Sequence, residues 1–152
     1  REAAAMFHGD GARWLAYGLV LLLAGCFREK DFLDAEVRRL CSQDGGVKIY
    51  ERIKLPVSKF DRYGEIYVPS RDKYKKIDEF YYVFEMHYYR RGNPEMWRAS
   101  YKLYREADGV LLGEATSYVR RGGDFPDFFR ATHIMCPVDA GIKAMSKEIF
   151  YH

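Results

Sequence analysis

Residues 79–121 contain three runs with the length and composition of β-strands, separated by two short turn sequences, GNPE and ADG. The runs are rich in aromatic and β-branched residues, and Gly, Asn, Pro and Asp are the residues that tight turns use. Strands joined by such short turns pair antiparallel. The segment therefore predicts a β-meander, and the rest of the fold must be built around its sheet.

The second turn determines which residues of the last two strands face each other. A two-residue loop, Asp108-Gly109, would place apolar residues opposite polar ones. A three-residue loop over residues 107–109, with Gly109 in the left-handed conformation, places large side chains opposite small ones. In this predicted register the facing pairs are Trp97–Val119, Ala99–Ser117, Tyr101–Ala115 and Leu103–Gly113 on one face, and Lys102–Glu114 and Arg98–Tyr118 on the other. The small residues should form a shallow dip into which a helix can pack.

Other segments add strands and helices to the meander. Its first run, residues 80–90, has apolar residues on both faces, so we expect a central strand. Residues 47–55 alternate like one half-buried strand that ends at Pro56. The remaining expected elements are short strands at residues 63–68 and 128–137 and a terminal helix at residues 141–150.

A helix is predicted to begin at Asp31, which can cap it, and to end at Gly45 and Gly46. One apolar stripe along this helix comprises Leu33, Val37, Leu40 and Cys41. The fold class is therefore α+β, with an N-terminal helix packed on an antiparallel β-meander sheet. This layout resembles that of cystatin-like and nuclear-transport-factor-2-like folds, without a motif of either.

Composition indicates one folded domain. Of the 152 residues, 48% are hydrophobic and 16% are aromatic, which suits a single core. The net charge of +3 is spread along the chain, so it does not indicate a nucleic-acid partner. We expect one α+β domain over residues 31–152.

An apolar run at residues 14–27 precedes this domain. It covers 14 residues between Arg13 and Arg28, whereas a membrane-spanning helix needs about 20. A short basic segment, an apolar stretch and small residues before a cysteine are typical of a signal peptide. We expect Met6 to be the natural start, with residues 1–5 extraneous to it.

The end of this run, Leu23-Ala24-Gly25-Cys26, resembles the lipobox of bacterial lipoproteins. The resemblance implies that a diacylglyceryl group is attached to the Cys26 thiol, that a signal peptide of residues 1–25 is removed, and that the new amino group is acylated. Two or three acyl chains would anchor the protein permanently, through a short lipidated tether at residues 26–30. The alternatives are an ordinary secretory signal with an incidental cysteine, or a short core strand.

The same resemblance implies a location. By the sorting rule of enteric bacteria, Phe27 rather than Asp after the cysteine implies an outer-membrane lipoprotein that faces the periplasm. The implied partner is membrane lipid, held through the anchor at Cys26. We expect no nucleic-acid partner, and no cofactor besides the covalent acyl chains.

Export would place the two other cysteines, Cys41 and Cys136, in an oxidising compartment. We predict a disulfide between them, which would tie the first helix to the last strand. The alternative is two buried free thiols. Their spacing fits neither a zinc site nor a CxxC redox motif.

No catalytic or metal-binding motif surrounds His87 or His133, so we expect no catalytic residue and no metal ligand, and interpret both histidines as structural. The arginine doublets suggest a basic rim at one end of the meander, facing lipid phosphates or an anionic glycan. The candidate binding residues are Arg90, Arg91, Arg120, Arg121, His87 and Tyr89. The alternative is that these are solvated strand ends.

We therefore expect a membrane-anchored lipoprotein that is a binding or structural module of the bacterial cell envelope. One alternative is a periplasmic hydrolase, which needs a pocket joining His87 or His133 to a carboxylate. Another is an envelope accessory, such as an exclusion or assembly factor that binds another protein. An exposed aromatic patch would favour that alternative.

Overall fold

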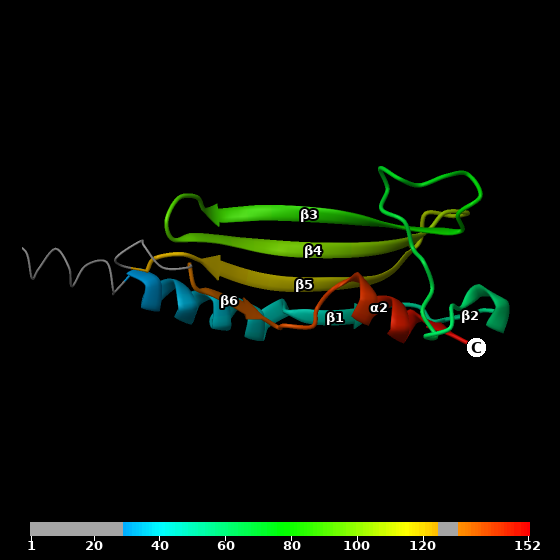
Figure 1. Ribbon diagram of the computed structural model, residues 1–152, viewed down its shortest axis with the longest axis horizontal. Coiled ribbons are helices and arrows are strands. Elements are labelled where there is room, and N and C mark those ends of the chain that lie inside the picture. Colours follow the sequence, from blue (N-terminus) through cyan, green and yellow to red (C-terminus); the bar gives the residue numbers. More distant parts are fainter. Residues whose placement is uncertain (1–28, 125–130) are drawn as a thin grey trace, which may run out of the picture.

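The computed structural model describes residues 29–124 and 131–152, which form an antiparallel sheet with a helix at each end of the chain (Figure 1). The N-terminal helix covers residues 29–44. The elements that follow are β1 (Gly46–Ile49), β2 (Ile53–Lys54), the 3-10 turn η1 (Val57–Lys59), β3 (Phe80–Arg90), β4 (Glu95–Arg105), β5 (Leu111–Arg121), β6 (His133–Cys136), α2 (Ile142–Ile149) and β7 (Phe150–Tyr151). The α+β class is as the sequence predicts.

The main sheet has five strands. Four follow the order β1-β5-β4-β3, and the fifth, β6, shares one edge of β5 with β1: β1 pairs with residues 113–116 and β6 with residues 118–121. The long strands β3, β4 and β5 are the predicted meander. The register of β4 and β5 is also the predicted one: Trp97 faces Val119, Ala99 faces Ser117, Tyr101 faces Ala115, Leu103 faces Gly113, Lys102 faces Glu114 and Arg98 faces Tyr118. The alternation of side chains therefore predicts the facing pairs of this hairpin correctly.

The turn between β4 and β5 contains one bulge. Gly109 has a φ of +67°, the left-handed conformation that the sequence predicts there. Next to it the register shifts, so that Tyr104 faces Leu111, and the Arg105 N–H donates to the Val110 carbonyl. The turn therefore spans four residues, 106–109, and the prediction of a three-residue loop is wrong. Leu112 is the extra residue of the bulge, and because it offsets the longer turn, the predicted pairs are present beyond it.

β3 is an edge strand, so the prediction of a central strand is wrong. Its aromatic side chains on both faces suggested coverage, but β1 and β6 both pair with β5 and leave the outer edge of β3 unpaired along most of its length. Residues 69–71 cover only the start of that edge, through a bridge between Ser70 and Tyr82. Phe84, Met86 and Tyr89 are exposed as a result.

The two helices cover opposite faces of the sheet. Facing residues of neighbouring strands point to the same side, so the side chains that each helix contacts identify the face that it covers. The apolar stripe of the N-terminal helix packs on Met96 and Tyr118, whose side chains lie on one face. α2 packs on the face that carries Leu103 and Ala115. The disulfide between Cys41 and Cys136, with Cα atoms 5.8 Å apart, joins the N-terminal helix to β6, as predicted.

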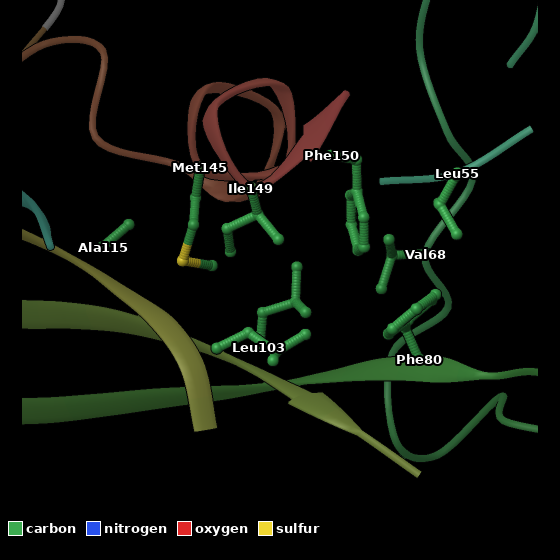
Figure 2. Close-up of a cluster of buried hydrophobic side chains, with 9 residues drawn as sticks. Leu55, Val68, Phe80, Leu103, Ala115, Met145, Ile149 and Phe150 are labelled. Carbon is green, nitrogen blue, oxygen red and sulfur yellow. The ribbon is translucent and has the colours of Figure 1, made fainter. Parts of the chain in front are cut away.

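The main core lies between α2 and the sheet (Figure 2). Met145 and Ile149 point from α2 toward Leu103 and Ala115. The Phe150 ring lies tilted against the Phe80 ring, at a centroid distance of 4.7 Å. A Cβ atom at Gly113 would lie 2.9 Å from Cδ1 of Ile149 and 3.0 Å from the Lys48 carbonyl oxygen. Glycine is therefore required there, and the dip of small residues receives α2 rather than the N-terminal helix.

Three boundaries differ from the sequence predictions. The predicted strand at residues 47–55 is split, because the N–H groups of Tyr50 and Glu51 both donate to the Leu112 carbonyl; β1 then belongs to the main sheet and β2 pairs with β7. Residues 63–68 form no strand. The first helix already includes residues 29 and 30, so Asp31 lies inside it and is not its cap.

Lys30, in the first turn of this helix, forms a long-range ion pair. Its Nζ donates to the Asp124 carboxylate at 2.5 Å, which ties the start of the helix to the segment after β5. Asp124 also accepts a hydrogen bond from the Thr132 N–H at 2.6 Å. These bonds lower the pKa of Asp124 to about 2, and the bond from Lys30 has the largest effect. A sequence pattern of apolar residues contains no sign of this long-range ion pair.

Candidate functional site

A groove of about 650 Å³ lies on the α2 face of the sheet, between β3 and α2. Its floor consists of Ala99, Ser117 and Val119 from the two inner strands of the meander. Phe84 and Met86 of β3 form one wall. The opposite wall comes from α2 and the segment before it, and comprises Val138, Asp139, Ala140, Gly141, Lys143, Ala144 and Lys147.

The groove exists because small residues continue along the sheet beyond the reach of α2. Ala99 and Ser117 face each other directly, and neither side chain fills the space above the sheet. α2 is only eight residues long, and its buried Met145 and Ile149 cover Gly113 farther along β5. The surface above Ala99 and Ser117 is therefore left hollow.

Apolar side chains at the rim of this groove remain accessible to solvent. Phe84 is 43% exposed, Met86 is 45% exposed and Met135 of β6 is 39% exposed. The Phe84 ring lies 4.8 Å from that of Tyr101, which stiffens this wall. Burial raises the pKa of Tyr101, so its hydroxyl stays neutral. Flexible Met side chains beside rigid aromatic rings suit an apolar ligand of variable shape.

The α2 wall of the groove carries charged side chains. Lys143 and Lys147 project from successive turns of α2, and both pair with Glu65, at 2.9 Å and 3.0 Å. Their hydrogen bonds lower the pKa of Glu65, so the carboxylate stays ionised. The lysine side chains are mostly exposed, and an anionic group beside this wall could share them with Glu65. The groove can therefore hold an apolar chain with a negative end.

The predicted histidines do not lie in this groove. His87 is exposed on β3, with its ring 5.1 Å from that of Tyr89 on the face of the N-terminal helix. His133 is exposed on β6 and faces Arg121. Within residues 29–124 and 131–152, no carboxylate bonds to either histidine and no group of three or more His, Cys, Asp or Glu could hold a metal ion. The structure does not bring either histidine together with an acid.

The arginine doublets do not form the predicted basic rim. Arg120 is 2% exposed, and its guanidinium bonds to Asp34 at 2.6 Å and to the carbonyls of Gly122 and Thr132, so it cannot reach a lipid phosphate or a glycan. Arg90 pairs with Glu29, and Arg121 lies 3.8 Å from Glu95. Arg91 lies over the Tyr88 ring at 4.2 Å. Of these four arginines, Arg120 is buried, and the other three each contact a neighbouring side chain.

The face of the N-terminal helix carries a second polar cluster. Tyr118 donates to Asp44 at 2.6 Å, and Arg98 lies 3.4 Å from Glu114 and 3.5 Å from Asp44. Ser100 also donates to Glu114 at 2.9 Å. Burial and the bond to Asp44 raise the pKa of Tyr118 well above its ordinary value. These bonds join the N-terminal helix to the sheet, although the Arg98 Nε is buried without a partner among the described residues.

Sequence reasoning missed the groove, although part of the signal was present. The sequence predicts the dip at Ala99 and Ser117, and the alternation of side chains along residues 80–90 places Phe84 and Met86 on one face of that strand. The groove could not be predicted, because the sequence does not show how far the terminal helix extends along the sheet. Once α2 covers only part of the dip, the remainder becomes a groove.

Cys26 and the apolar run at residues 14–27 lie outside the described residues. Within the described ranges, no helix is long and apolar enough to cross a membrane. Comparison of the chain with family models, with curated proteins and with solved structures found no match.

Proposed function

We propose that the protein is a lipid-anchored binding module of the bacterial cell envelope, which holds an elongated apolar molecule with an anionic end. The observation that carries the binding role is the apolar groove between β3 and α2. Its volume of about 650 Å³ falls in the range of small-molecule sites, about 300 to 1,000 Å³. A single acyl chain with a carboxylate or phosphate head group has this shape and chemistry.

The envelope location is supported by two features of different kinds. Leu23-Ala24-Gly25-Cys26 resembles a lipobox, and a disulfide joins Cys41 to Cys136. Disulfides persist in exported proteins and are rare in the reducing cytosol. Anchoring at Cys26 would keep the domain beside a membrane, which is the source of apolar chains for the groove.

The anchor is tested by the intact mass of the full chain extracted from bacterial membranes without reductant, beside a Cys26→Ser variant. We expect a chain that starts at Cys26, heavier by two or three acyl chains and lighter by the two hydrogens that a disulfide removes. The Cys26→Ser variant should carry no acyl chain. An unmodified wild-type chain that retains residues 19–25 would overturn the lipoprotein proposal.

The binding role is tested with a photoactivatable fatty acid that carries a diazirine, added to the full chain in detergent and irradiated. Peptide mapping should find the label on the groove walls, in β3 and α2. Ala144→Phe places a ring in the groove and should reduce that labelling about tenfold, which corresponds to about 1.4 kcal/mol of binding free energy. Ala144 lies on the half-exposed side of α2, so the fold should tolerate the ring.

The matched control is Ala107→Phe, which makes the same substitution in the exposed turn between β4 and β5. It should leave the labelling of β3 and α2 unchanged. Labelling spread evenly over the chain, or equal labelling of the wild type and the Ala144→Phe variant, would show that the groove does not bind the probe.

A further inference from the structure

The outer edge of β3 presents backbone hydrogen-bonding groups that no strand of the described residues pairs with. Tyr82 donates its N–H to the Pro69 carbonyl and accepts from the Arg71 N–H, so its backbone points away from β4. Alternate residues of an antiparallel strand point to the same side. The N–H and C=O groups of Phe84, Met86 and Tyr88 therefore also point outward, and in the described part of the chain no backbone group pairs with them.

This edge lacks the usual protection against pairing. Exposed edges are commonly shortened, bulged, or occupied by lysine or proline. β3 has eleven residues without lysine or proline, and its bulge lies at the far end, between Tyr88 and Arg90. The central residue of the open stretch, Met86, is 45% exposed. The edge is thus available as a template for another strand.

We propose that β3 pairs antiparallel with β3 of a second copy of this chain, with Met86 on the two-fold axis. Such a pairing is isologous, because the same strand is used by both copies. The three outward-pointing residues of each copy would form about six backbone hydrogen bonds across the interface. This inference goes beyond the proposed binding function and does not depend on it.

The sequence of β3 is self-complementary in this register. On the groove face, Phe84 meets the partner's Tyr88 twice, on either side of the Met86 pair. On the other face, Glu85 meets the partner's His87 twice. Glu85 bonds to Lys102 through Oε2, at 2.7 Å, which leaves Oε1 for the histidine. Aromatic pairs and hydrogen-bonding pairs both stabilise facing strands.

Neighbouring registers lose this complementarity. A shift of two residues toward the start of β3 places Glu85 against the partner's Glu85, and like charges directly opposite each other are destabilising. It also requires Tyr82, whose backbone is already bonded to residues 69–71. A shift toward the end of β3 places His87 against its own copy and Phe84 against the partner's Arg90. Of the three registers, only that centred on Met86 matches every facing pair.

The register is tested by cysteine cross-linking of the full chain in bacterial membranes under mild oxidation. Facing Cα atoms of a hydrogen-bonded antiparallel pair lie about 5.5 Å apart, within the range that a disulfide spans. Met86→Cys should therefore give a covalent dimer on a non-reducing gel, which disappears on reduction. Phe84→Cys is the matched control, because residue 84 and its copy would be four residues apart along the strands, about 14 Å.

Charge exchange provides a second test without a new cysteine. Glu85→Lys and His87→Glu should each reduce chemical cross-linking of the dimer at least fivefold, and the double variant should restore it by exchanging the two sides. Glu148→Lys, on the exposed side of α2, makes the same charge change away from β3 and should have no effect. Equal cross-linking of Met86→Cys and Phe84→Cys, a disulfide to a different protein, or no covalent dimer would each overturn the proposal.

Discussion

Replacing both Cys41 and Cys136 by serine should lower the free energy of unfolding by up to about 4 to 5 kcal/mol. The two cysteines are separated by 95 residues in sequence, so their bond closes a long loop and restricts the unfolded chain strongly. Serine is close to cysteine in size, so the variant removes the cross-link without opening a large cavity. In urea, the midpoint of unfolding should fall by about 2 M when followed by circular dichroism.

The wild type treated with reductant is the matched control for this variant. It should unfold at nearly the same urea concentration as the Cys41→Ser/Cys136→Ser variant, because both lack the same bond. Reductant should not change the variant itself. If the wild type unfolds at the same midpoint with and without reductant, the disulfide does not contribute to stability, and the support that it gives to an oxidising location is lost as well.

The hairpin of β4 and β5 could be predicted from sequence because its information is local. The alternation of side chains fixes the two faces, and the match of large side chains to small ones fixes the register. The loop itself was predicted one residue too short, because a bulge at Leu112 offsets the longer turn. All six predicted facing pairs are present in the structure. The place of β3 in the sheet could not be predicted in this way, because it depends on whether segments distant in sequence pair with it. Both β1 and β6 pair with β5 instead.

The candidate site shows the same division between local and distant information. Cys41 and Cys136 could be paired by prediction, because few cysteines are present and each lies on a recognisable element. The arginine doublets could not be interpreted, because adjacent residues of a strand point to opposite faces. Arg120 is buried against Asp34 while its neighbour Arg121 is exposed. Adjacent arginines in the sequence therefore do not predict a shared basic surface in the fold.

The buried arginine leads to the second large expected effect: Asp34→Asn should destabilise the protein by about 3 kcal/mol. The Arg120 guanidinium is 2% exposed and bonds to both carboxylate oxygens of Asp34, at 2.6 Å and 3.0 Å. An amide leaves that cation buried without a counter-charge, which costs about 3 to 5 kcal/mol at fully buried sites. Asp34 retains 17% exposure, so the lower value is expected in urea unfolding.

A double variant separates the charge from the packing. Asp34→Asn/Arg120→Met removes both members of the pair and keeps an apolar chain of similar length in the interior. It should be less destabilised than the sum of the two single variants, because the cost of an unpaired buried charge is absent from it. Glu36→Gln, which breaks an exposed ion pair with Arg39 on the same helix, should leave the midpoint nearly unchanged. Additive losses in the double variant would mean that Asp34 and Arg120 act independently, and that the helix is held to the sheet mainly by Leu33 and Val37.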